Sequence, residues 1–220
     1  NPLAHSLALD KVVAKMIFQQ NGLPTPDFIV IKDKNFDPPK IPYPLIVKPK
    51  NEAVSMGIEI VHNLEELQKA AKIILEDFNQ SVLVEQYIDG PEISVNAFVL
   101  EGKVIYNFIT DRFVVEGLPG GIIKGHRIPS RAAKEVQDKA AKLTREVIEA
   151  LEIMNGPVYF QMKYVNDSIY IIEVAPRLDG CHLWRLIELK YGVNLLQLTF
   201  DLLTGKTDGL PVDYSEPMPR

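Results

Sequence analysis

Apolar residues recur at two spacings along the chain, and each spacing predicts one type of secondary structure. Helical spacing opens the chain with Leu9, Val12, Val13, Met16 and Ile17. We expect this first helix to end at Asn21-Gly22, residues typical of a helix C-terminus. The same spacing recurs in four later segments, 67–78, 136–151, 182–190 and 194–203. Asn63, with Glu66 three residues on, offers an N-terminal cap for the first of these four.

Shorter apolar runs predict strands. They lie at 28–31, 45–48, 59–61, 82–87, 93–100, 104–108, 158–165 and 168–175. Tight turns at Glu101-Gly102 and Asn166-Asp167 join the last four runs into two antiparallel hairpins. Between the hairpins, a glycine-rich loop extending to Gly125 is expected before the long helix.

The order of these elements predicts an α/β (α+β) fold with two lobes. We expect a lead-in helix and linker in 1–27, a smaller lobe in 28–90 and a larger lobe in 91–220. A doubly wound parallel sheet would alternate strand and helix throughout, whereas the second lobe is built from hairpins. Because the chain begins almost directly with a helix, we also expect that an N-terminal domain precedes it in a longer protein.

Composition narrows the class of protein. The 220 residues, 46% of them apolar, are enough to bury a substantial core. There is no apolar run of about 18 residues and no signal-peptide pattern, so neither a membrane span nor secretion is expected. A single cysteine fits a reducing cytoplasm. The net charge of −5 is spread without a long basic run, which argues against nucleic acid as a partner.

Lys48 ends a predicted buried strand and precedes the loop 51–57. A lysine beside a loop containing serine and glycine suits phosphate, because the ammonium supplies charge and the loop supplies backbone N–H donors. This is not a Walker loop, since the lysine comes first and no Gly-Lys-Ser/Thr follows. The alternative is a solvated lysine before an ordinary turn.

Two carboxylates, Glu85 and Glu92, stand seven residues apart across a strand-to-strand junction. Such a junction is a natural hinge, whose backbone can bind adenine while a carboxylate accepts hydrogen bonds from the amino group or from ribose. The alternative is that both acids are simply solvated.

Gln161 and Glu173 lie on the two strands of the second hairpin, and the tight turn between them makes those strands adjacent. The two side chains could therefore share a hard cation through oxygen atoms. Arg177, which follows Pro176, can add a guanidinium to a phosphate or a carboxylate. The alternative for Glu173 is a surface ion pair.

Other candidates carry weaker signals. Cys181-His182 has the composition of a nucleophile and base, but sequence neighbours do not face one another. His126 and Arg127 belong to the glycine-rich stretch, which could close over a substrate or be a plain surface loop.

In this order and spacing, the motifs resemble the ATP-grasp superfamily, in its carboxylate-amine ligase, biotin-carboxylase-like and carbamoyl-phosphate-synthase-like branch. The resemblance runs from Asp10 to Gly205. It implies that Lys11 and Lys48 contact the phosphates of ATP, together with the loop residues Ser55, Met56 and Gly57. The family motif for adenine and ribose is matched by Glu85, Gln86, Tyr87, Ile88 and Glu92.

The resemblance further implies that Gln161 and Glu173 bind Mg²⁺, with Mn²⁺ as an alternative ion, and that Arg177 and Lys48 neutralise charge during phosphoryl transfer. One position departs from the family pattern: Ala175 stands where an asparagine usually binds a metal ion.

The implied function is a Mg²⁺-dependent ligase that uses ATP to activate a carboxylate as an acyl phosphate, which an amine or similar nucleophile then attacks. Ala175 keeps open a second function, a regulatory or catalytically impaired nucleotide-binding module. A biotin-carboxylase-type enzyme would have a phosphate loop richer in glycine than 51–57. The partners implied are ATP and small-molecule substrates, and a homodimer is left open.

Overall fold

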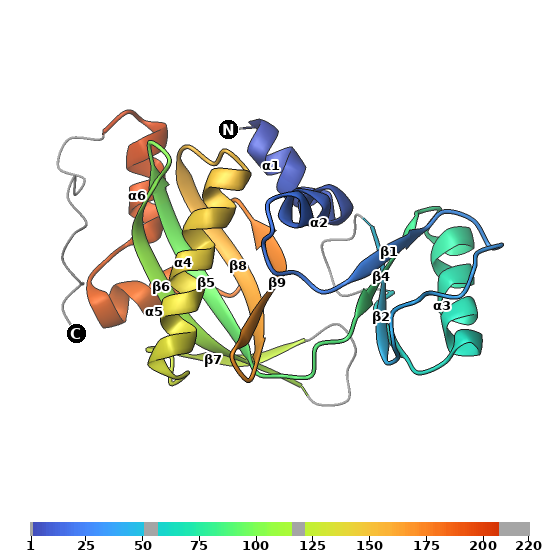
Figure 1. Ribbon diagram of the computed structural model, residues 1–220. Coiled ribbons are helices and arrows are strands. Elements are labelled where there is room, and N and C mark those ends of the chain that lie inside the picture. Colours follow the sequence, from blue (N-terminus) through green and yellow to red (C-terminus); the bar gives the residue numbers. More distant parts are fainter. Residues whose placement is uncertain (1, 51–56, 116–121, 207–220) are drawn as a thin grey trace.

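The computed structural model describes residues 2–50, 57–115 and 122–206, which form two lobes, each built around an antiparallel sheet (Figure 1). Ser55 and Met56 lie outside the described residues. Within them, no helix is long and apolar enough to cross a membrane.

The smaller lobe is a four-stranded sheet in the order β1-β4-β2-β3. Its strands are β1 (Phe28–Ile31), β2 (Leu45–Pro49), β3 (Glu59–Val61) and β4 (Val82–Gln86). Helix α3 (Leu64–Asp77) covers the face that lies away from the larger lobe (Figure 1). The predicted cap is confirmed, because the Asn63 side chain accepts from Glu66 N at 3.0 Å. The Glu66 carboxylate in turn accepts from His62 N.

The larger lobe is a five-stranded sheet in the order β7-β6-β5-β8-β9. Its strands are β5 (Glu92–Leu100), β6 (Lys103–Val114), β7 (Ile123–Arg127), β8 (Gly156–Val165) and β9 (Ser168–Ala175). Both predicted hairpins are confirmed. The expectation that Gly125, His126 and Arg127 lie in a loop is wrong: they form β7, which pairs with the end of β6. The glycines of this segment indicated a loop, and the edge strand was therefore not predicted.

One face of the large sheet carries the main core. Strand β5 contributes every second residue to it, Ile93, Val95, Ala97 and Val99. Helix α4 (Lys134–Ala150) packs on this face through the predicted stripe. Phe160 of β8 is fully buried in the same core, so its truncation to alanine would cost about 3–5 kcal/mol of folding stability.

The beginning of the chain forms two helices rather than the single helix expected. They are α1 (Pro2–Leu9) and α2 (Lys11–Gln20). Asp10 separates them because its carboxylate accepts from the N–H groups of Val12 and Val13 and so caps α2. Both helices pack into the core of the larger lobe, for example through Ala8 and Phe18.

The opposite face of the large sheet is apolar at one end of its strands and polar at the other. At one end, Phe98 and Phe108 pack under α5 (Leu183–Tyr191) and α6 (Leu195–Leu203). Toward the other end of β5, the same face carries Asn96, Ser94 and Glu92, all buried. A strand interior that buries alternating polar side chains on one face is typical of a functional surface, because each buried polar group needs a partner.

A short segment after β4 joins the two lobes and lies tightly against β8. A Cβ atom on Gly90 would lie 2.2 Å from the carbonyl oxygen of Tyr164. Only glycine permits this approach, and the adjacent Pro91 carbonyl accepts from Tyr164 N at 3.2 Å. The hinge is therefore held to the larger lobe at a defined point.

Candidate functional site

Three charged side chains meet where the two lobes join. Glu85 of β4 forms ion pairs with Lys48 of β2 and with Lys15 of α2. Lys48 is 6% exposed, and Glu85 and Lys15 are each 2% exposed. The alternatives in which Lys48 and Glu85 are solvated are therefore wrong. We refer to Lys15, Glu85 and Lys48 as the junction triad.

Burial and neighbouring charges shift the pKa values of Glu85 and Lys15 in the junction triad. Burial alone would raise the pKa of Glu85, but the two ammonium groups outweigh it and lower that pKa. Burial lowers the pKa of Lys15 to about 8; Glu85 opposes this shift and Lys48 adds to it. The carboxylate is thus dominated by its two cations, whereas the pKa of Lys15 is dominated by burial.

The hinge residues predicted to bind adenine lie next to the junction triad. The backbone N–H of Gln86 donates to Asp27 O at 2.8 Å, and that of Tyr87 donates to Pro44 O at 3.3 Å. The Lys163 ammonium donates to Ile88 O at 2.9 Å and lies 5.1 Å from the centroid of the Tyr87 ring. In this structure these backbone donors therefore bind other parts of the chain.

Glu92, the second predicted carboxylate, is 8% exposed, so the solvated alternative is wrong for it as well. Its carboxylate pairs with Arg112 of β6. It also accepts from Gln161 Nε2 at 2.9 Å and lies 3.5 Å from the ammonium of Lys163. Three strands thus converge on one carboxylate at the hinge end of the large sheet.

Cross-strand register extends this cluster into a polar surface. Thr110, Ser94, Gln161 and Glu173 are successive partners across β6, β5, β8 and β9. The predicted adjacency of Gln161 and Glu173 is confirmed.

The neighbouring rows of the sheet add further polar groups. Ser94 and Tyr159 are hydrogen-bonded through their hydroxyls at 2.9 Å. His126 pairs with Arg112 in register, and its Nδ1 lies 3.3 Å from the Thr110 hydroxyl. Burial, followed by the nearby Arg112, lowers the pKa of His126.

Several of these residues carried a signal that the sequence-based prediction missed. Glu92, Ser94 and Asn96 alternate with apolar residues within a strand, which indicates one apolar and one polar face. Lys15 lies three residues from both Val12 and Phe18 in an amphipathic helix, which places a charge close to the buried stripe. Arg112 had no comparable signal, because strand β6 was expected to end at Phe108.

The remaining predicted residues lie in different surroundings. Lys11 is the first residue of α2, one turn before Lys15. Gly57 has a φ of 69°, and a Cβ atom there would lie 3.1 Å from the Pro49 ring. Arg177 is exposed and its guanidinium donates to the neighbouring Leu178 O at 2.9 Å.

The residues expected to bind metal fit one magnesium ion but not two. The Gln161 side chain donates a hydrogen bond from Nε2 to Glu92. The carbonyl oxygen of the Gln161 side chain is thereby left to bind a hard cation. No ion pair or hydrogen bond within the described part of the chain engages the Glu173 carboxylate, so the surface ion pair is not supported there. Ala175 offers no side-chain donor, and the described residues hold no cluster of three His, Cys, Asp or Glu.

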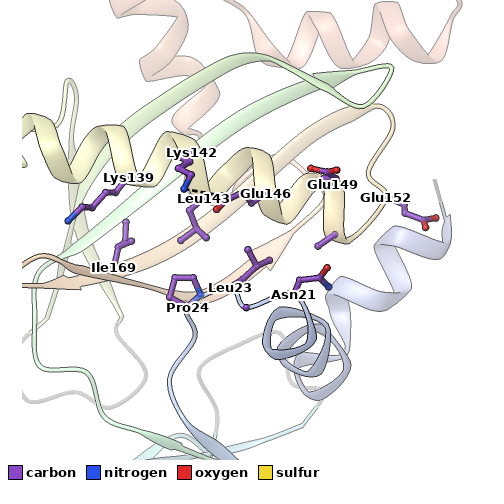
Figure 2. A pocket seen from close by; sticks show the side chains of 12 residues that line it. Asn21, Leu23, Pro24, Lys139, Lys142, Leu143, Glu146, Glu149, Glu152 and Ile169 are labelled. Atoms are coloured by element: carbon purple, nitrogen blue, oxygen red, sulfur yellow. Dashed lines mark ion pairs between the residues drawn. The ribbon is translucent and has the colours of Figure 1, made fainter.

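A separate hollow lies on the other face of the larger lobe, between α4 and the turn that follows α2 (Figure 2). Its volume is about 730 Å³. Apolar side chains that include Leu23, Leu143 and Ile169 line it, and lysines and glutamates of α4 stand around its edge. None of the predicted site residues lines this hollow, and its charges are of both signs, so we place the chemistry at the lobe junction instead.

Two antiparallel sheets linked by a hinge, with buried lysines and glutamates at the junction, define a two-lobed α/β fold. Within this class the chain belongs to the ATP-grasp family, because the model of the ATP-grasp domain matches residues 41–183, more than half of the chain.

Several of the matched proteins are named as ligases of amino acids. The D-alanine–D-alanine ligase of Carboxydothermus hydrogenoformans is 31% identical over 189 residues, which are 78% of this chain and 60% of that protein. The crystal structure of an L-amino acid ligase from Bacillus licheniformis superposes with a TM-score of 0.74 at 26% identity, covering 90% of this chain and 48% of that one.

A structure of D-alanine–D-alanine ligase from Bacillus anthracis complexed with ATP gives a TM-score of 0.75. It is 24% identical and covers 95% of this chain and 71% of that chain, and this likeness supports the fold. The chain spans between 28% and 60% of the length of the first curated relatives that it matches.

Proposed function

We propose that this chain is the nucleotide-binding part of an ATP-dependent ligase that joins a carboxylate to an amine. The observation that carries the proposal is the junction triad, in which Lys48 is held at the lobe junction by a buried carboxylate in a chain of the ATP-grasp family. A buried lysine near the end of a strand is well suited to bind phosphate, because little solvent competes with the ligand there.

The proposed reaction has two steps. An oxygen of the substrate carboxylate attacks the γ-phosphorus of ATP, and the bond to the β-phosphate oxygen breaks, which gives an acyl phosphate and ADP. The amine nitrogen then attacks the acyl carbon, the carbon–oxygen bond to phosphate breaks, and the nitrogen loses a proton. Positioning and charge neutralisation supply most of the catalysis in such phosphoryl transfers, so no side-chain nucleophile is required.

Each set of residues has a proposed role in this scheme. Lys48, Lys11 and residues 55–57 bind phosphate. The hinge 85–88 binds adenine through groups other than the N–H donors of Gln86 and Tyr87, which bind Asp27 O and Pro44 O. Gln161 and Glu173 would hold one Mg²⁺, which supplies charge neutralisation at the phosphate oxygens when bound. Arg177 is exposed and close in sequence to the metal pair, and we assign it to phosphate or to the substrate carboxylate.

The substrates that we propose to test first are amino acids, since the relatives are named as D-alanine and L-amino acid ligases. The test is release of ADP and phosphate by the full-length protein, supplied with MgATP and paired D- and L-amino acids. ADP release that requires both a carboxylate and an amine is the expected result. Tight MgATP binding without turnover on any pair would count against the ligase.

A second candidate is a nucleotide-binding module without turnover. Ala175 favours it, because this residue removes one metal ligand from the strand that carries Glu173. The same ADP-release assay decides between the two candidates, with MgATP affinity measured alongside to show that the nucleotide site is intact.

Lys48→Ala tests the phosphate contact itself. Folding should be affected only modestly, because Glu85 keeps Lys15 as its partner. MgATP binding should weaken far more, since a charge-assisted phosphate contact is lost. Lys69→Ala, which removes an exposed lysine on α3, is the matched control. Equal nucleotide affinity in the two variants would remove Lys48 from the site.

A further inference from the structure

Lys15 is held at the meeting point of three parts of the chain. Its ammonium pairs with Glu85 of the smaller lobe and donates to the Thr25 hydroxyl at 2.7 Å. Thr25 in turn donates to Ile171 O of β9 at 3.1 Å. The ammonium also lies 5.8 Å from the centroid of the Phe28 ring. Lys15 thus connects α2, the smaller lobe and the large sheet through contacts that leave it 2% exposed.

The two lysines of the junction triad are not equivalent. Each forms an ion pair with a different oxygen of Glu85: Lys15 with Oε1 and Lys48 with Oε2. Lys15 has a second fixed partner in Thr25 and is enclosed. Lys48 is the penultimate residue of β2, and Glu85 is the partner of its ammonium in the described part of the chain. A phosphate that binds Lys48 can therefore draw it away from Glu85, whereas Lys15 stays in place.

Charge balance decides what happens to Glu85 when Lys48 turns to a phosphate. With Lys15 protonated, Glu85 keeps one cation and the pair left behind is neutral. With Lys15 uncharged, Glu85 would become an isolated buried carboxylate, which is strongly unfavourable. The charged groups that act on Lys15 within the described chain are Glu85 and Lys48, so no other residue there supplies the balance.

We propose that Lys15 is a positioning residue of the nucleotide site, which holds Glu85 when phosphates engage Lys48 and which takes up a proton as they do so. This inference rests on the proposed function. It adds a residue outside the predicted set and a coupling between nucleotide binding and pH.

The coupling has a definite direction. In the free protein, burial and the neighbouring Lys48 lower the pKa of Lys15 to about 8. Phosphate charge beside Lys48 removes part of that repulsion, so the pKa of Lys15 rises on binding. Near pH 8, binding should therefore take up as much as about half a proton, and above pH 8 affinity should fall by up to about tenfold per pH unit.

Proton uptake can be measured directly on the unaltered protein. MgADP is titrated calorimetrically at pH 8 in two buffers with different ionisation enthalpies, and the difference in apparent binding enthalpy gives the number of protons taken up. Lys15→Met should abolish the uptake and weaken MgADP binding about tenfold or more, because Lys48 can leave Glu85 only at the cost of an unpaired carboxylate. Lys69→Met should change neither quantity.

Lys15→Arg distinguishes a positioning role of Lys15 in nucleotide binding from a purely structural role. Arginine carries a permanent charge, so this variant should recover MgADP affinity over Lys15→Met but show no proton uptake at pH 8. Binding of MgADP by the unaltered protein without proton uptake would overturn the inference alone, as would equal uptake in Lys15→Met. Absence of MgADP binding at every pH would overturn the proposed function and the inference with it.

Discussion

Glu85→Gln is the substitution that should reveal the energetics of the junction triad. Glutamine has nearly the same size as glutamate but no charge, so packing around position 85 is kept. Lys15 and Lys48 would lose their shared counterion while remaining 2% and 6% exposed. Removing one partner of a buried ion pair costs about 3–5 kcal/mol, mainly because the remaining charge stays buried and unpaired.

For a chain of this length, each kcal/mol lowers the melting temperature by about 2–4 °C. The expected loss is therefore roughly 6–20 °C near pH 7. The pKa of Glu85 is lowered by folding, so its contribution is complete above the ordinary value of 4.5 and is lost as pH falls through the lower folded pKa. The difference between variant and unaltered protein should shrink in acid, where Glu85 is itself neutral.

The assay is thermal unfolding followed by circular dichroism without nucleotide, from pH 3 to pH 9. Glu76→Gln is the control, because Glu76 forms an exposed pair with Lys72 at 3.9 Å on α3 and should leave the melting temperature unchanged. A loss below about 1 kcal/mol at pH 7, the size expected of a surface pair, would refute the reasoning. So would a loss of the same size at pH 3 and pH 7.

Three further predictions concern other parts of the structure. Gly90→Ala should destabilise the protein by about 1–3 kcal/mol and weaken nucleotide binding, because the added Cβ would collide with Tyr164 O. Gly125→Ala is the control, since open space surrounds Gly125, and it should change neither stability in chemical unfolding nor nucleotide affinity. Glu173→Gln should raise the Mg²⁺ concentration needed for MgATP binding, and an unchanged Mg²⁺ titration would remove Glu173 from the metal site. Asp111→Asn should flatten the acid limb of the stability profile in chemical unfolding. Burial would raise the pKa of Asp111, but hydrogen bonds from Ser130 and neighbouring groups outweigh it and lower that pKa. Its contribution is therefore complete above the ordinary value of 3.8 and is lost as pH falls through the lower folded pKa.

Local patterns allowed most of the elements to be predicted. The cap at Asn63 and the turn at Asn166-Asp167 involve residues within a few positions of each other, so the sequence contains all the information they need. The edge strand β7 was not predicted, because its residues do not by themselves indicate a strand. It is held by pairing with Asp111 and Arg112, more than ten residues earlier, and Gly125 lies within it.

The site was predictable only in part because its geometry depends on strand register. Gln161 and Glu173 belong to one hairpin, and their pairing could be counted from the turn. The contact between Glu92 and Arg112 required the full length of β6, whose second half carries charged residues and was not expected to be a strand. Polar side chains that face a ligand weaken the apolar pattern from which strands are predicted, so functional strands are the ones most easily missed.

Lys11 and Lys15 show why a motif and a structure can point to different residues. They are four positions apart, one helical turn, so both lie on the same side of α2. Lys11 is half-buried at the start of the helix, and the family motif favours it. Lys15 is enclosed by Glu85 and Thr25 from two other parts of the chain. Burying a lysine is costly unless it is paired, and a pair that joins α2 to the smaller lobe also fixes the carboxylate that holds Lys48. The residue that we propose contacts the ligand and the residue that we propose keeps the site assembled are thus separated by one turn, and only tertiary contacts distinguish them.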